Sequence, residues 1–116
     1  MGAGIWNFEI EQGAKFDRTL TWKVDGVLVN LTGYSARMQI RLTVDSAETL
    51  IDLDSDTKGG LILGGSAGTI SIFISFVDTE GLDFERAVHD IEVTQPDEEV
   101  IRLLQGAVTL SKEVTK

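Results

Sequence analysis

The sequence predicts an all-β sandwich, and three segments with alternating apolar residues carry this prediction. In segments 16–24, 36–42 and 70–76, apolar side chains fall on alternate positions, with Arg18 as the one interruption in the first segment. This period places the apolar residues on one face of a strand, so that the polar residues between them face water or a partner. No segment has comparably regular helical spacing. Because a sandwich hosts many unrelated activities, the fold class alone assigns no function.

Turn residues divide the first half of the chain into strands. Asp25 and Gly26 suit a tight hairpin, because glycine tolerates the positive φ that such a turn requires. The run Asn30–Gly33 is typical of a turn, since Asn and Thr bond to nearby backbone and Gly supplies conformational freedom. The strands expected between these breaks span 5–11, 16–24, 27–29 and 34–43.

The second half continues the same pattern and brings the total to about eight strands. Segment 54–60 is a loop by composition. Segment 76–82 suits one helical turn, with Asp78 or Thr79 as N-cap and Gly81 ending it. A turn at Pro96 then separates the last two strands. The strands expected here span 49–53, 61–63, 67–75, 86–94 and 99 to about 110.

Length and composition predict one domain. The chain has 116 residues, of which 42% are hydrophobic, enough for a single core. We expect one sandwich domain over 1–116, with short flexible ends at about 1–4 and 111–116. The sequence contains no cysteine, which excludes disulfides and thiolate metal sites. Stability therefore has to come from packing.

Charge and hydropathy exclude several classes of partner. Nineteen acidic against ten basic residues give a formal charge of −9, which disfavours binding to nucleic-acid phosphates. The acidity suits a solvated surface, and it also complements a basic patch on another protein. No segment resembles a signal peptide or reaches membrane-spanning length, so we expect no membrane partner and no secretion of this chain on its own.

The most metal-like pattern is the series Asp52, Asp54 and Asp56, which imitates the start of a calcium loop. An EF-hand loop needs Gly at its sixth position and Glu at its twelfth. Thr57 and Leu63 occupy these positions. The pattern therefore favours a solvated strand end and loop over a weak calcium site.

No catalytic group stands out. His89 is the only histidine, and it lies in an alternating strand with no partner residue placed beside it. We expect it to be partly buried or at a sheet edge. The serines lack a Gly-x-Ser-x-Gly motif, and the glycine pairs lack the Gly-Lys-Ser/Thr of a phosphate loop. We therefore predict no enzyme activity, no catalytic, cofactor-binding or metal residues, and no cofactor.

The aromatic residues near the N-terminus suggest a core rather than a ligand platform. Trp6 and Trp22, with Phe8 and Phe16, fall on the inward positions of their strands. Core packing of such rings buries about 150–250 Å² each. A stacking platform for sugars, as in a carbohydrate-binding module, would need them exposed. This module is the alternative function.

Three residues are the candidates for partner binding. Phe73 falls on the outward side of its strand, between Ser71 and Ser75, where an exposed aromatic ring marks a contact surface. Arg37 and Arg41 also face outward, where they suit acidic partners or simply a solvated face. Unpaired strand edges offer a further route, by accepting a strand from a neighbour.

The order of these elements resembles a bacteriophage module. The similarity is to the N-terminal domain of upper baseplate proteins and related tail-fibre attachment proteins of tailed bacteriophages. It covers most of the chain, and its motifs are turns and strand patterns. The segments that carry it are Gln12–Ala14, Leu20–Trp22, Asp25–Gly26, Val29–Arg41, Gly68–Ile72 and Asp90–Val93.

The resemblance implies an Ig-like fold and a role in virion assembly, in which the domain holds receptor-binding or fibre components on the particle. We therefore expect a virion structural protein, assembled in the host cytoplasm, whose partners are other virion proteins and copies of itself. In the family the domain leads into a longer fibre or linker, whereas this chain ends soon after its last strand. A tail, baseplate or neck component and a capsid cement protein therefore both remain open.

Overall fold

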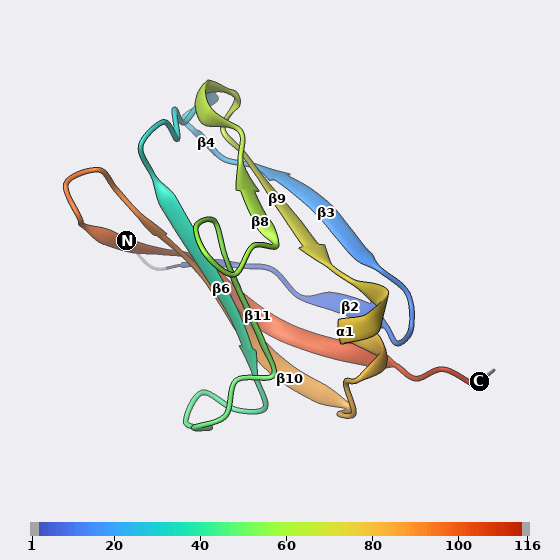
Figure 1. The fold of residues 1–116 in the computed structure, drawn as a ribbon. Helices are drawn as coiled ribbons and strands as arrows, with labels where there is room; N and C mark the ends of the chain where they lie inside the picture. The colour runs from blue at the N-terminus through green and yellow to red at the C-terminus, as the bar shows by residue number, and fades with distance from the viewer. Residues whose placement is uncertain (1–2, 115–116) are drawn as a thin grey trace.

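A computed structural model describes residues 3–114, and it confirms the predicted all-β sandwich (Figure 1). A sheet of six strands, here the larger sheet, faces one of three strands, the smaller sheet, and two further strands form a hairpin. The larger sheet comprises β1 (Gly4–Ile5), β2 (Phe8–Glu11), β6 (Ser35–Arg41), β7 (Ile51–Asp54), β10 (Arg86–Thr94) and β11 (Val100–Ser111). The smaller sheet comprises β3 (Phe16–Thr21), β8 (Leu61–Leu63) and β9 (Thr69–Ile74), and the hairpin comprises β4 (Lys23–Val24) and β5 (Val27–Leu28).

The order of the strands is that of an Ig-like sandwich. The larger sheet runs β11, β10, β6, β7, which corresponds to strands G, F, C and C′ of an immunoglobulin domain. The smaller sheet runs β3, β9, β8, which corresponds to B, E and D. A 3-10 turn (Gly65–Ala67) and one short helix, α1 (Phe76–Glu80), connect strands. Within residues 3–114, no helix has the length and apolar character needed to span a bilayer.

The N-terminal strand departs from the antiparallel arrangement. Both β1 and β2 pair with β11 in parallel, with Gly4 opposite Leu104 and Phe8 opposite Val108. In an immunoglobulin domain the first strand also pairs with strand B. Here the described N-terminal residues pair only with the larger sheet, so β3 is the outer strand of the smaller sheet.

Alternation along the strands builds the core as the sequence predicts. Along β10 every second residue is buried, from Ala87 to Val93. The same pattern holds in β6 and β9, and full burial of an aliphatic side chain contributes about 1.5–3 kcal/mol. The side chains with the least exposure are those of Ile10, Met38, Ile40, Ile72, Ile91, Val93 and Val108.

Two local details differ from the predictions. The helix begins one turn earlier than expected, because Ser75 is its N-cap and accepts the amide of Asp78 at 3.2 Å. Thr79 is instead buried, and its hydroxyl donates to the Ala14 carbonyl at 2.8 Å. The expected strand 16–24 breaks at Trp22, which lies between β3 and β4. Gly81 caps the helix C-terminus as predicted.

Close approach of the N-terminal strand depends on Gly106. This residue lies opposite His89 in the ladder between β10 and β11. A Cβ atom at Gly106 would lie 2.2 Å from the Trp6 carbonyl oxygen and 2.7 Å from Asn7 Oδ1. That Oδ1 atom accepts the amide of Ala107 at 2.8 Å. Glycine is therefore required where the N-terminal chain crosses β11.

We predict that Gly106→Ala lowers the free energy of unfolding by about 1–3 kcal/mol, because the added methyl group forces the N-terminal strand away from β11. Urea denaturation followed by tryptophan fluorescence measures the change. Gly81→Ala is the matched control, since its Cβ would have no neighbour closer than 3.6 Å. Equal stability of the two variants would contradict the steric role of Gly106.

Candidate docking surface

The outer face of the larger sheet gathers four of the five arginines of this acidic chain. Alternation along β6 places Arg37 and Arg41 outward, as predicted. Arg86 has the same outward position at the start of β10. Arg86 was not among the predicted contact residues, although the alternation of its strand was enough to predict its outward position.

Arg102 joins this face only because of a bulge. Leu110 and Val108 are buried, so a regular alternation along β11 would also place Arg102, six residues before Val108, on the inner face. However, Ile91 pairs with Leu104 while the next residue, Glu92, pairs with Arg102, so β11 contains an extra residue at this point. Such a bulge reverses the direction of the side chains beyond it. The sequence carried a signal that was missed, because the apolar residues change from odd positions, at Ile101 and Leu103, to even positions from Leu104 onward.

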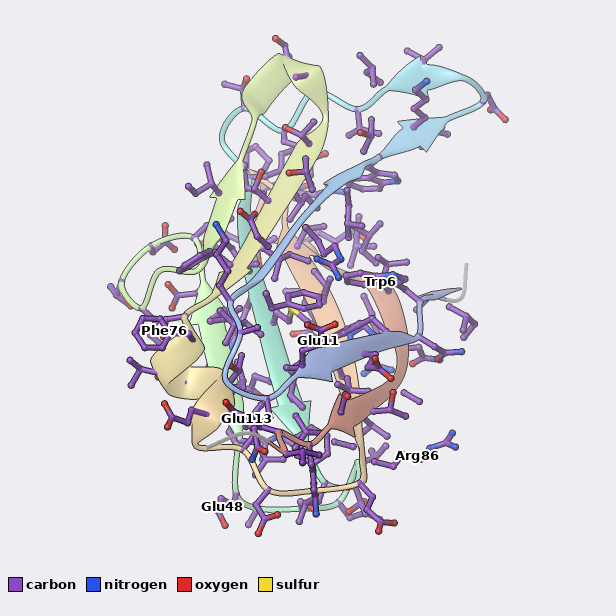
Figure 2. The ribbon with its side chains drawn as sticks, turned by 90° about the vertical axis from the view of Figure 1, so that its right-hand side faces the viewer. Trp6, Glu11, Glu48, Phe76, Arg86 and Glu113 are labelled. Atoms are coloured by element: carbon purple, nitrogen blue, oxygen red, sulfur yellow. The ribbon has the colours of Figure 1, made fainter. Side chains whose placement is uncertain are left out.

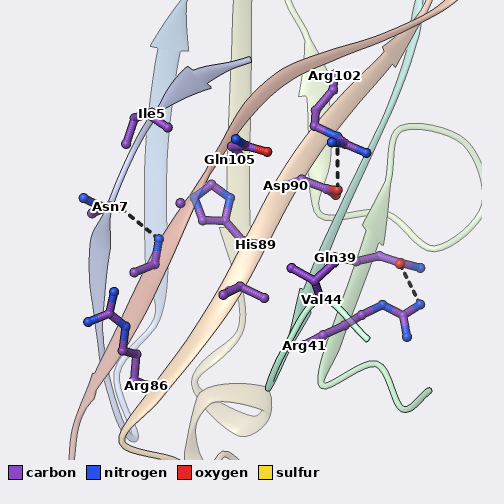
Figure 3. Close-up of a pocket in the computed structure, with 13 residues that line it drawn as sticks. Ile5, Asn7, Gln39, Arg41, Val44, Arg86, His89, Asp90, Arg102 and Gln105 are labelled. Carbon is purple, nitrogen blue, oxygen red and sulfur yellow. Dashed lines mark hydrogen bonds and ion pairs between the residues drawn. The ribbon is translucent and has the colours of Figure 1, made fainter. Parts of the chain in front are cut away.

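Three of these arginines, Arg41, Arg86 and Arg102, line a shallow groove of about 600 Å³ (Figure 3). The groove also contains one carboxylate, that of Asp90, and several apolar side chains. Its electrostatic character is therefore positive, although the protein carries a charge of −9. The charged residues of the lining are Arg41, Arg86, Asp90 and Arg102. The uncharged polar ones include Asn7, Gln39 and Gln105, and the apolar ones include Ile5, Val44, Val88 and Ala107.

The arginines of the groove differ in how far they are already engaged. Arg41 donates to Gln39 Oε1 at 2.9 Å and to the carbonyl of Ser46 at 2.8 Å, which holds the loop after β6. Arg102 pairs with Asp90 at 3.7 Å. Arg86 is exposed and has no hydrogen bond or ion pair within residues 3–114. Its guanidinium group therefore offers the most complete set of donors to a partner.

Asp52 and Asp54 at β7 form ion pairs and hydrogen bonds within the protein. Asp52 lies near Arg37 at 3.7 Å and bonds to Lys58. Burial alone would raise the pKa of Asp52, but the hydrogen bond and charge of Lys58, helped by Gln39 and Arg37, hold it below its ordinary value.

Asp54 closes the loop that follows β7. Its carboxylate accepts the amides of Lys58, Asp56 and Thr57 at 2.8–3.0 Å, and these bonds, led by that of Lys58, lower its pKa. Asp56 lies beyond the strand, in this loop. No group of three or more potential metal ligands occurs within residues 3–114.

Phe73 lies on the opposite side of the molecule from the arginines. Its side chain is 45% exposed on the outer face of the smaller sheet, next to Asp17 on β3. Ile62, on β8, is 70% exposed on the same face. The three predicted contact residues therefore do not share one surface: Arg37 and Arg41 lie together, and Phe73 lies apart.

His89 is buried rather than placed at a sheet edge. Its Nε2 atom lies 2.6 Å from the Trp6 carbonyl oxygen, which can only accept a hydrogen bond, so Nε2 carries the proton. Nδ1 is buried and has no partner within residues 3–114. Burial lowers the pKa of His89 below its ordinary value of 6.5 and outweighs the Trp6 bond and the charge of Asp90, which raise it.

The aromatic residues near the N-terminus pack together, as predicted for a core. The ring centroids of Trp6 and Phe8 lie 4.5 Å apart, and those of Phe8 and Phe16 lie 4.9 Å apart. Trp22 is half-buried against Tyr34 at 6.5 Å. No Trp, Tyr or Phe lines the groove, so it offers no stacking platform for a sugar ring.

The sequence was also compared with known proteins. No protein-family model matches the chain, and no curated protein is significantly similar to it.

We predict that the protein loses stability as the pH falls below about 6.5, because the folded state holds His89 neutral while the unfolded chain takes up the proton. The slope approaches at most about 1.4 kcal/mol per pH unit, and it levels off once the pH passes the lowered pKa of the folded state. Urea denaturation between pH 7 and 5 measures the slope. His89→Gln removes the titrating group, so an unchanged slope in that variant would refute the assignment.

Proposed function

We propose that this chain is a non-enzymatic structural protein of a tailed-bacteriophage virion, which docks to other virion proteins through the arginine-rich outer face of its larger sheet. The observation that carries the proposal is the groove on this face, whose lining holds three arginines and one aspartate in a protein with a charge of −9. The partner surface is acidic, and it belongs to a tail, baseplate or neck subunit, or to a capsid subunit if the chain is a cement protein.

Arginine suits this role chemically. Its guanidinium group presents several donors in a plane and pairs with carboxylates through two bonds at once. On an acidic protein, a local positive surface also orients the encounter with an acidic partner, because the remaining surface is repelled. Arg86, which is exposed and has no ion pair within residues 3–114, supplies the strongest contact. The apolar side chains of the groove add apolar surface that docking removes from water.

The turns that carry the family resemblance adopt the backbone geometry that their residue types favour. Asp25 and Gly26 both adopt positive φ, at 52° and 80°, in the hairpin between β4 and β5. Asn30 accepts the amide of Thr32 at 3.0 Å, and Gly33 follows with φ of 83°. The residue types that define the resemblance are therefore those on which the local backbone geometry depends.

We predict that Arg86→Glu weakens binding to the particle more than tenfold, since placing like charges together across an interface costs several kcal/mol, and about 1.4 kcal/mol is tenfold in affinity. The measurement is co-sedimentation of purified chain with particles of its own phage grown without this gene product. Lys23→Glu is the matched control, because Lys23 is exposed in the hairpin, away from the groove.

Equal binding by both charge-reversal variants would place the contact elsewhere on the molecule. Failure of the unaltered chain to bind any such particle would refute the virion role itself.

A further inference from the structure

No strand within residues 3–114 pairs with the outer edge of β3. Trp22 donates to the Gly68 carbonyl at 2.8 Å, and this bond sets which residues of β3 bond to β9. Alternate residues of an antiparallel strand direct their amide and carbonyl groups to opposite sides. Asp17, Thr19 and Thr21 therefore direct theirs away from β9, toward the position that the first strand fills in an immunoglobulin domain.

Apolar side chains border this open edge. Trp6, Phe8, Leu20 and Trp22 are only partly buried and pack against the core. Figure 2 views the molecule from the side on which β3 and β2 lie, and Trp6 is labelled there. An added strand would complete the smaller sheet and remove more of these side chains from water, which is favourable in proportion to the area covered.

We propose that β3 pairs antiparallel with β3 of a second copy of this chain, which joins the two smaller sheets into one. In the register centred on Thr19, this residue faces its own equivalent, and Asp17 faces Thr21 of the second copy. On the inner side, Phe16 faces Trp22 and Arg18 faces Leu20. This register opposes no like charges, and Thr–Thr and aromatic pairs across strands are favourable.

The edge of the larger sheet at β7 is not self-complementary in this way. Ser55 donates to the Ala36 carbonyl at 3.0 Å, so by the same alternation Asp52 directs its backbone groups away from β6. Pairing of β7 with a second β7 around this residue would place Asp52 opposite Asp52. Like charges directly opposite each other destabilise a strand pair. The two edges therefore differ in the occupant that they accept.

Arg18 weakens the pairing of β3 with a second strand. Its NH1 group donates to the Asp17 carbonyl at 2.9 Å, which is one of the groups that a second strand needs. The guanidinium carbon lies 4.7 Å from the centre of the Phe16 ring, on the inner side of the sheet. An inward charge on an edge strand opposes pairing. Self-association of the unaltered chain is therefore weak and depends on concentration.

Arg18→Thr tests this restraint, and sedimentation equilibrium measures the result. We expect the variant to lower the dimer dissociation constant at least tenfold. The double variant Arg18→Thr, Thr19→Pro should be monomeric again. Proline at position 19 removes an amide that points away from β9, so the hydrogen bonds between β3 and β9 are kept. Asp52→Pro, at the edge of β7, is the matched control and should leave the dimer intact. A monomeric Arg18→Thr variant at millimolar concentration would overturn the proposal.

A cross-link provides a second test that does not depend on proline being tolerated. The chain has no cysteine, so Thr19→Cys introduces a single thiol. Across the proposed pair the two Cα atoms lie about 5.5 Å apart, within the range that a disulfide spans. Mild oxidation should give a covalent dimer faster than for Thr109→Cys, which is exposed on β11. Equal rates would refute the interface.

This proposal rests on the geometry of the strand edge and not on the virion role. Loss of particle binding in Arg86→Glu would not affect the proposed β3 dimer. A monomeric Arg18→Thr variant would refute the dimer and would not affect the proposed docking surface.

Discussion

The parallel pairing of the N-terminal strand with β11 is the constraint on which the rest of the molecule depends. It enlarges one sheet to six strands and leaves the other with three. It brings the Trp6 carbonyl over β11 so closely that only glycine fits at position 106. It also leaves the outer side of β3 without a neighbour among the described residues. One choice of strand partner thus determines a buried contact, a steric requirement for glycine and an unpaired strand edge.

His89 shows how this pairing affects the interior. Its ring lies among aromatic side chains, with its centroid 4.8 Å from that of Phe8 and 5.6 Å from that of Trp6. Its one hydrogen bond reaches the N-terminal strand, and its other nitrogen has no partner within the described residues. Because a buried ring in this environment resists protonation, the attachment of the N-terminal strand is linked to the charge of one side chain. The residue is thus a structural element of the sheet contact rather than a free acid–base group.

The two proposed interaction surfaces lie on different parts of the sandwich. The arginine-rich groove occupies the outer face of the larger sheet, whereas the open edge belongs to the smaller sheet. One relies on side-chain charge, and the other relies on backbone groups and a self-complementary register. A second copy on β3 would leave the groove accessible. The two proposed contacts are therefore compatible, because neither occupies the surface that the other requires.

The sequence by itself determined the fold class and the direction of most side chains. Alternation is a local property, so the outward positions of Phe73, Arg37 and Arg41 followed from the residues next to each of them, whereas the sequence left His89 either partly buried or at a sheet edge. The tertiary structure alone decided which strands pair, because that choice is a competition between segments far apart in the chain. It assigned the N-terminal strand to β11 and brought Arg86 beside Arg41. It also turned Arg102 outward through a bulge, since the register that creates the bulge is set by pairing with β10.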